Sequence, residues 1–301
     1  MPSIKKLLKN PYKIIFLLDR SKITNLISDE LYLKWKYRAI FGKKLNLKTP
    51  QTFNEKLQWL KLHDRNPEYV NMVDKFTAKK IAGSIIGDEY IIPTIGVWDN
   101  VDEIDFESLP EQFVLKCTHD SGGVVVCNDK DKLDIDAAKK KLRKAFKTNY
   151  FYPDREWPYK KIKPRIIAEE YMESESGDLP DYKFFCFDGV PKAMFVATDR
   201  ATDVKFDFYD IEFNHLPFVW GHEHADKDIP KPKGFELMKE LASKLSQGIP
   251  HVRVDFYDVN GKVYFGEMTF YHWSGICPFE PEEWDYKFGE FIDLNIVKEH
   301  N

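Results

Sequence analysis

The stretch Val252–Gly275, VRVDFYDVNGKVYFGEMTFYHWSG, decides the fold because it has the pattern of a β-hairpin. Its first half alternates apolar residues with charged or polar ones, which is typical of a half-buried strand. Asn260 and Gly261 both tolerate the positive φ of a tight reversal, so they indicate the turn. This apolar strand pair also contains two carboxylates, Asp255 and Glu267, and a buried carboxylate is costly unless it has a partner.

The two carboxylates are expected to lie opposite each other, because they stand on antiparallel strands on either side of the turn. On the second strand, the alternation of side-chain direction places Glu267 on the same face as Val263 and Phe265. Two close carboxylates repel each other unless a cation lies between them, and paired carboxylate oxygens suit Mg²⁺. Arg253 stands two residues before Asp255 on the same strand face, where it can reach a transferring phosphoryl group. We therefore predict a magnesium and phosphoryl site on this hairpin.

The composition bounds the class of protein. A chain of 301 residues with 43% hydrophobic residues can bury a sizeable core. A net charge of −4 argues against a nucleic-acid-binding protein, so we expect no nucleic-acid partner. The four cysteines have no zinc-like spacing, and three of them lie in strand-like apolar runs, where buried free thiols are expected. With neither a secretory signal nor a membrane span in view, we expect a cytoplasmic protein.

The basic charge is concentrated in residues 1–48, which carry twelve Lys or Arg and three acidic residues, a net charge of +9. The segment IKKLLKNPYKIIFLL places lysines beside apolar residues, and Pro11 divides it into two short pieces. One interpretation is a helical cap that packs on the rest of the protein. The other is that residues 1–48 also rest peripherally on the anionic inner face of the membrane.

The order of predicted elements is that of an α+β protein. The first ~70 residues are expected to be helical, including Leu7 and Leu8, and Thr52 with Glu55 predicts a capping box. The later predictions are a helix over 68–87, a strand–turn–strand over 112–129, a helix over 135–151, a strand over 164–172, a hairpin with a Gly-Pro turn over 181–199, a helix over 234–248 and a helix over 287–297.

Lys116 lies inside the apolar strand pattern FVLKC and is followed by the loop Ser121-Gly122-Gly123. An unpaired buried ammonium is penalised, and a glycine loop offers backbone N–H groups to an anion, so the two features together indicate a phosphate cradle. The alternative is an edge-strand lysine beside an ordinary turn. The sequence contains neither a Walker A motif nor G-x-G-x-x-G, which argues against those phosphate sites.

Two other polar groups have open interpretations. Glu169 and Glu170 end an apolar strand before Tyr171, which suits either an adenine-binding strand end or a plain solvated one. In GHEHADKD, His222 and His224 flank Glu223 and suggest a metal site, but the polar surroundings favour a solvated substrate loop.

These motifs together resemble the ATP-grasp ligases, and most closely the bacterial TupA-like ATP-grasp proteins of surface-polysaccharide gene sets. The similarity covers about residues 48–292. Six blocks agree in order and spacing: TFNEKLQWLKLHDRNP, MVDKFTAKK, FVLKCTHDSGG, IIAEEYM, DYKFFCFDG and VRVDFYDVNGKVYFGEMTFYHWSG.

The resemblance implies an ATP-grasp fold, in which two α+β lobes sandwich ATP, here with a helical N-terminal region. The expected units are a basic helical region over 1–70, a linker and the start of the ATP-grasp unit over 71–111, a lid subdomain over 112–170 and a C-terminal subdomain with the metal site over 171–301.

The resemblance also implies a role for each matching residue. Thr269 stands where the ligases usually place an asparagine, so a second metal ion is expected to be held less well. The implied ATP-binding residues are Lys75, Lys116, Ser121, Gly122, Gly123, Glu169, Glu170, Tyr171, Met172 and Asp181. The implied metal ligands are Asp255, Glu267 and Thr269, and the implied catalytic residues are Arg253 and Lys183.

The function implied is an ATP- and Mg²⁺-dependent ligase that joins a carboxylate to an amine through an acylphosphate. The expected partners are a small-molecule or lipid-linked saccharide and an amine, with the amide formed on a uronic acid of a bacterial cell-surface polysaccharide. The alternatives are an ATP-grasp kinase that phosphorylates a sugar hydroxyl, and a glycosyltransferase of polysaccharide biosynthesis.

Overall fold

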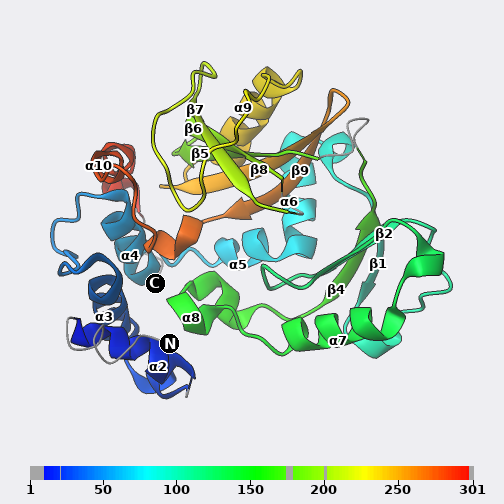
Figure 1. The fold of residues 1–301 in the computed structure, drawn as a ribbon, viewed down its shortest axis with the longest axis horizontal. Coiled ribbons are helices and arrows are strands. Elements are labelled where there is room, and N and C mark those ends of the chain that lie inside the picture. Colours follow the sequence, from blue (N-terminus) through cyan, green and yellow to red (C-terminus); the bar gives the residue numbers. More distant parts are fainter. Residues whose placement is uncertain (1–9, 21, 174–178, 200–201, 298–301) are drawn as a thin grey trace.

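The computed structural model describes residues 10–20, 22–173, 179–199 and 202–297 (Figure 1). It contains two antiparallel sheets and a group of helices formed by the N-terminal third and the end of the chain. Leu7 and Leu8, which the sequence assigns to a helix, lie outside the described residues. Within these ranges every helix is too short or too polar to cross a bilayer.

The smaller sheet has the strand order β1-β4-β2-β3, and helix α7 (Ile135–Phe146) packs on its last two strands. Asp134 caps the start of this helix, and its side chain accepts a hydrogen bond from the Ala137 N–H. The strands are β1 Thr94–Trp98, β4 Ile166–Glu170, β2 Phe113–Cys117 and β3 Val124–Cys127. The predicted strand–turn–strand over 112–129 is confirmed, whereas β1 was not predicted.

The larger sheet has the order β7-β6-β5-β8-β9 and forms the main core with helix α9 (Phe235–Leu245) on one face. The hairpin predicted over 181–199 is confirmed, but its turn residues are Asp188 and Gly189, both with positive φ. The strands are β5 Asp181–Phe187, β6 Val190–Thr198, β7 Lys205–Asp210, β8 Val252–Val259 and β9 Lys262–Thr269. All four cysteines are free; Cys117, Cys127 and Cys186 are buried, as predicted for three of them, and Cys277 is partly exposed.

Several further helices lie beside the two sheets (Figure 1). They are α2 Ile15–Arg20, α3 Asp29–Phe41, α4 Phe53–His63, α8 Phe151–Asp154 and α10 Glu283–Glu290. The capping box predicted at the start of α4 is confirmed, with the Thr52 hydroxyl 3.2 Å from the Glu55 amide nitrogen. Phe53 is fully buried and joins α4 to the large sheet and to α10. The last α-helix lies earlier than the predicted 287–297, and Leu294–Ile296 forms a 3-10 turn instead.

The single helix predicted over 68–87 is wrong, because the chain breaks at Asp74 into α5 (Glu68–Val73) and α6 (Lys75–Ile86). Asp74 is extended, and its carboxylate accepts hydrogen bonds from the N–H groups of Phe76 and Thr77, both at 2.9 Å. The break makes Lys75 the first residue of α6. Its own N–H donates to the carbonyl of Thr118, 3.0 Å away, so Lys75 lies beside the loop that follows β2.

A β-bulge at Gly266 sets the register of the hairpin formed by β8 and β9. Phe256 pairs with Phe265 and Asp255 pairs with Glu267, so Gly266 is the extra residue. Without the bulge, Asp255 would face Gly266, and Glu267 would point to the opposite face of the sheet. The predicted opposition of the two carboxylates is therefore confirmed. The prediction that Glu267 shares a strand face with Phe265 is wrong, because Phe265 is buried on the core face while the Glu267 side chain is 40% exposed.

We expect Gly266→Ala to lower the free energy of unfolding by about 1–3 kcal/mol. A Cβ at this position would lie 3.1 Å from the Asp255 carbonyl oxygen, which belongs to a central strand and cannot move away freely. Gly122→Ala is the control, because a Cβ there meets nothing within 4 Å. Chemical denaturation measures both variants, and equal stability of the two would contradict this role for Gly266.

Candidate active site

One face of the large sheet holds a row of charged side chains on three adjacent strands. The register pairs Lys183 of β5 with Asp255 of β8, and Asp255 in turn with Glu267 of β9. On β8 these polar residues alternate with the fully buried core residues, so they point away from the core. The structure thus brings together six of the residues that the sequence assigns to the site: Asp181, Lys183, Arg253, Asp255, Glu267 and Thr269.

The guanidinium of Arg253 connects this row. Its Nε and Nη2 atoms donate to the two carboxylate oxygens of Asp255, each at 2.7 Å, in the bidentate geometry that suits arginine. Nη2 also lies 3.2 Å from Glu267 Oε1 and 3.0 Å from Thr269 Oγ1. Lys183 donates to Asp255 and lies 2.6 Å from Asp181 Oδ2. Both carboxylates of the hairpin are therefore paired with cations.

Lys75 connects helix α6 to this row. Its ammonium lies 3.9 Å from Glu267 Oε2 and donates to the carbonyl oxygen of Asp120 in the loop after β2. Burial raises the pKa of Glu267, but Lys75, Lys183 and Arg253 outweigh that effect and lower it to about 2. Because 40% of the side chain is exposed, solvent screens part of this attraction. Glu267 is ionised at neutral pH.

A second ion cluster lies in the small sheet around Glu169. Its carboxylate oxygens lie 2.5 Å from the Lys79 ammonium and 2.6 Å from the Lys116 ammonium, and the side chain is 5% exposed. Burial raises the pKa of Glu169, but the two lysines outweigh it and lower the pKa below its usual value. The lysine inside an apolar strand is thus explained by a carboxylate on the neighbouring strand β4.

Glu267 also acts on Lys116, so the two ion clusters are electrostatically coupled. Burial lowers the pKa of Lys116, while Glu169, Tyr257 and Glu267 raise it above its usual value. Lys79 was missed by the sequence reasoning. Its signal is the spacing from Lys75, since residues four apart share one face of a helix.

The loop Ser121-Gly122-Gly123 joins β2 to β3. Gly122 is exposed, whereas Gly123 is buried and its N–H donates to Asp120 Oδ1, 3.1 Å away. A Cβ on Gly123 would lie 2.6 Å from the Cβ of Ala145 in α7, so a glycine is needed for close packing there. The assignment of this loop as a mobile flap over phosphates stays a prediction.

The residues assigned to adenine follow one another at the end of β4. Glu170 is exposed, and its N–H donates to the carbonyl of Pro93, 3.2 Å away. Tyr171 and Met172 come directly after the strand and are half-buried. Contacts from these residues to a nucleotide stay predictions.

His272 is a site residue that the sequence reasoning left without a role. Its Nδ1 lies 2.6 Å from Nη1 of Arg253. Burial and the charge of Arg253 hold the pKa of His272 well below its usual range, so the ring is neutral and Nδ1 accepts a hydrogen bond from the guanidinium. His272 therefore fixes Arg253 from the side opposite Asp255. The following Trp273 and Ser274 adopt positive φ, which is a strained conformation for residues other than glycine.

A further buried group, also missed, consists of Lys61, Glu156 and Ser274. The Lys61 ammonium donates to the Ser274 carbonyl oxygen, 2.7 Å away, and the Ser274 hydroxyl donates to the Glu156 carboxylate. Burial raises the pKa of Glu156 to about 7 against the opposing charges of Lys61 and Arg253. Burial likewise lowers the pKa of Lys61 to about 8. Burial thus shifts both pKa values toward the neutral forms, and Ser274 links the two side chains.

The family model described as TupA-like ATPgrasp matches residues 55–293. No protein with a curated description matches the sequence.

Solved structures of ATP-grasp ligases are similar at low identity. D-alanine–D-alanine ligase from Helicobacter pylori is 13% identical, with a TM-score of 0.44, over 84% of this chain and 70% of that one. D-alanine–D-alanine ligase from Bacillus anthracis complexed with ATP is 16% identical, with a TM-score of 0.37, over 66% of this chain and 53% of that one. This chain thus spans about half of the Bacillus anthracis ligase. With TM-scores below 0.5, these similarities say nothing about the substrate.

We expect Glu169→Gln to lower the free energy of unfolding by about 3 kcal/mol at neutral pH, because it leaves two ammonium groups without their counter-charge. Asp99→Asn is the control, since the ion pair of Asp99 with Lys163 is exposed and should contribute at most about 1 kcal/mol.

The difference between wild type and Glu169→Gln should depend on pH. The folded-state pKa of Glu169 lies below the usual glutamate value of about 4.5, so the carboxylate stabilises the fold above that pH. This contribution is lost as the pH falls through the folded-state pKa. Denaturation curves recorded from neutral pH downward should therefore converge, and a constant difference across this range would contradict the assignment.

Proposed function

Because this chain belongs to the TupA-like ATP-grasp family, we propose that it is an ATP-dependent ligase that joins a carboxylate to an amine. The fold is the α+β ATP-grasp fold. The observation that carries the proposal is the cluster of four cations, Lys75, Lys116, Lys183 and Arg253, around the carboxylates of one hairpin. A cationic cluster of this kind suits the phosphates of ATP.

In this proposal the lysines of α6 and β2 bind the phosphates of ATP. Lys75 and Lys116 come from different elements, and each is held by an acceptor on its own side, the Asp120 carbonyl and the Glu169 carboxylate. The backbone N–H groups of Ser121–Gly123 are additional donors to an anion. Glu170, Tyr171 and Met172 are proposed to contact the adenine, with Asp181 near the ribose.

The donors on the hairpin suit Mg²⁺. Asp255, Glu267 and Thr269 offer only oxygen atoms, which are the ligands that this ion prefers. All three lie within hydrogen-bonding distance of one guanidinium nitrogen, Nη2 of Arg253, so their oxygens converge on a common point. When bound, Mg²⁺ would neutralise charge on the β- and γ-phosphates.

The proposed reaction has two steps and needs no side-chain nucleophile. A carboxylate oxygen of the substrate attacks the γ-phosphorus, the bond from that phosphorus to the bridging oxygen breaks, and ADP leaves. Arg253 and Lys183 stabilise the negative charge on the transferred group. An amine then attacks the acyl carbon of the acylphosphate, inorganic phosphate leaves, and the nitrogen loses one proton. We propose a uronic acid of a bacterial surface polysaccharide as the carboxylate substrate, on the strength of the family resemblance alone.

Two alternatives make different demands on the site. A kinase would use the same cations but pass the phosphoryl group to a sugar hydroxyl. A glycosyltransferase would need an Asp-x-Asp metal site, but the DKD at 129–131 gives little support, since Asp129 pairs with Lys132 at 2.5 Å beyond the end of β3.

The test is ADP release in the presence of uronic-acid sugars with amino acids or simple amines, followed by trapping with hydroxylamine. A ligase gives inorganic phosphate and a hydroxamate, because hydroxylamine captures the acylphosphate. Asp255→Asn and Glu267→Gln should each lower turnover by about 100-fold or more, whereas Glu240→Gln on the exposed face of α9 should not. A phosphorylated sugar without hydroxamate would establish the kinase instead.

We also propose that residues 1–48 bring the protein to an anionic membrane surface, where a lipid-linked saccharide would be available. Four of the more exposed apolar side chains lie in this region. They are Ile14 at 46%, Ile23 at 52%, Leu26 at 89% and Leu31 at 43%. Apolar side chains beside an excess of lysine suit the headgroup region of an anionic leaflet. Part of the positive charge of residues 1–48 stabilises the fold instead, since the Lys36 ammonium is buried 2.6 Å from Asp154.

Sedimentation with vesicles tests the membrane contact. The wild type should bind anionic and not neutral vesicles, and high salt should release it, because each nearby Lys or Arg contributes about 1 kcal/mol. The double variant Ile23→Ser, Leu26→Ser should bind less. Val126→Ser is the control, since Val126 is 58% exposed but lies on the small sheet. If the wild type bound neither kind of vesicle, residues 1–48 would be a helical cap only.

A further inference from the structure

The loop after β7 folds back and runs along its own strand. The N–H of Asp210 donates to the Asn214 carbonyl at 2.9 Å, and the N–H of Leu216 donates to the Phe208 carbonyl at 2.7 Å. On the other side, the N–H of Phe206 donates to the carbonyl of Glu223 at 3.0 Å. The loop is thus fastened to β7 on both sides of Asp207.

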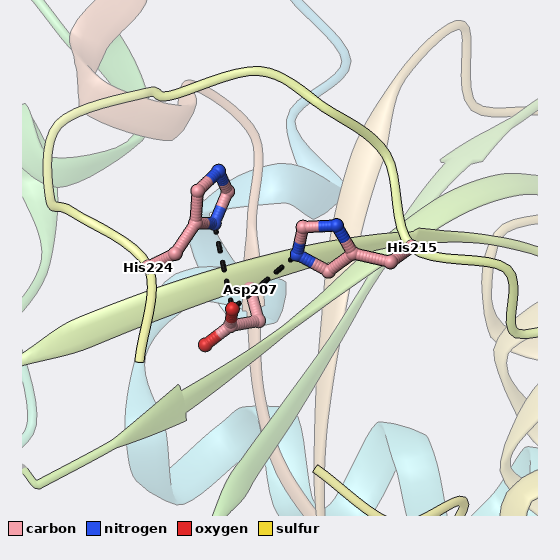
Figure 2. Close-up of side chains that lie close together, drawn as sticks. All are labelled: Asp207, His215 and His224. Carbon is pink, nitrogen blue, oxygen red and sulfur yellow. Dashed lines mark hydrogen bonds and ion pairs between the residues drawn. The ribbon is translucent and has the colours of Figure 1, made fainter. Parts of the chain in front are cut away.

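Two histidines of this loop converge on Asp207 (Figure 2). Oδ1 of Asp207 lies 3.4 Å from Nε2 of His215 and 3.4 Å from Nδ1 of His224. The three potential ligand atoms all lie within 4.8 Å of one another. Both 3.4 Å separations exceed the usual N–H···O range of about 2.7–3.2 Å, so these contacts are long for direct hydrogen bonds.

The same separations fit a metal ion. Bonds of about 2.0–2.1 Å at tetrahedral angles place neighbouring ligand atoms about 3.4 Å apart. The two distances from Asp207 Oδ1 to the histidine nitrogens already have this value. The distance between the two histidine nitrogens can shorten by rotation of His215, whose side chain is 45% exposed.

The orientation of the Asp207 carboxylate is fixed by its surroundings. The Asp207 side chain is 5% exposed, and its Oδ2 accepts a hydrogen bond from the Ala225 N–H, 3.1 Å away. Oδ1 is therefore directed at the histidines. A buried carboxylate needs a cation or several donors, and a bound metal ion would supply that charge.

We propose that Asp207, His215 and His224 form a binding site for a transition-metal ion of the Zn²⁺ type. Two imidazoles and one carboxylate suit Zn²⁺ far better than Mg²⁺, which prefers oxygen ligands. Three protein ligands leave a fourth position open to water. The site is separate from the all-oxygen donors of the hairpin and does not depend on the proposed ligase activity.

Metal binding at this site requires one particular tautomer of His224. Nδ1 of His224 lies 3.0 Å from the carbonyl oxygen of Phe206, so in the metal-free protein this nitrogen carries the hydrogen and donates it. Binding of a metal ion to Nδ1 requires that hydrogen to move to Nε2.

The sequence pair of His222 and His224 does not form the site. The His222 ring packs instead against Phe206 and Trp273, with ring centroids 4.6 and 5.7 Å apart. His222 also lines a cavity of about 420 Å³ together with Lys205 and Glu223. A metal ion that ties His215 and His224 to β7 would hold the loop that forms this wall of the cavity.

Calorimetric titration of the chelator-treated protein with Zn²⁺, in the presence of millimolar Mg²⁺, tests the proposal. One Zn²⁺ should bind per chain in the wild type and in the matched control His222→Ala. Binding should weaken by about tenfold or more in His215→Ala and in His224→Ala. Absence of stoichiometric binding in the wild type, or wild-type affinity in His215→Ala, would overturn the site.

A second readout separates metal binding from misfolding. Zn²⁺ should raise the melting temperature of the wild type and protect the loop over 211–224 from limited proteolysis. It should do neither in His215→Ala, a substitution at a half-exposed position that leaves the core intact. Circular dichroism matching the wild type confirms that this variant is folded. Equal protection by Zn²⁺ in this variant would place the metal elsewhere and overturn the proposal.

Discussion

The bidentate ion pair between Arg253 and Asp255 is the interaction on which the rest of the site depends. Both side chains are buried, and each alone would carry a large desolvation cost. The pair becomes stable only with further partners, namely Lys183 on Asp255 and neutral His272 on the other edge of the guanidinium. These partners come from β5 and from the turn after β9, so the pair depends on both neighbours of β8 in the large sheet.

The two sheets contribute charges of opposite sign to one cluster. The large sheet supplies most of the carboxylates, while Lys75 on α6 and Lys116 on the small sheet act on Glu267 from the other side. In this structure the charges neutralise one another, which keeps the buried face compatible with folding. In the proposed enzyme, ATP and Mg²⁺ would take over some of these partnerships, so that the cations hold phosphates rather than carboxylates.

Features set by neighbouring residues could be predicted from the sequence. The capping box at Thr52 and the turn at Asn260 follow from local backbone chemistry, and the opposition of Asp255 and Glu267 follows from the hairpin. The bulge at Gly266 could not be predicted, because the alternation pattern alone does not show where a ladder gains a residue. The break at Asp74 was missed because a strong helical pattern continues across it, and the roles of His272 and Glu156 depend on partners far away in the chain.

The central claim is that nucleotide phosphates and a divalent ion bind where these carboxylates and cations meet. The most direct measurement is a crystal structure with a non-hydrolysable ATP analogue and Mn²⁺ in place of Mg²⁺, with anomalous diffraction used to locate the metal. The account predicts an anomalous peak beside Asp255 and Glu267, with phosphate oxygens in contact with Lys75, Lys116 and Arg253. Phosphates bound away from the hairpin, with the ion pair of Arg253 and Asp255 unchanged and no metal beside it, would contradict the account.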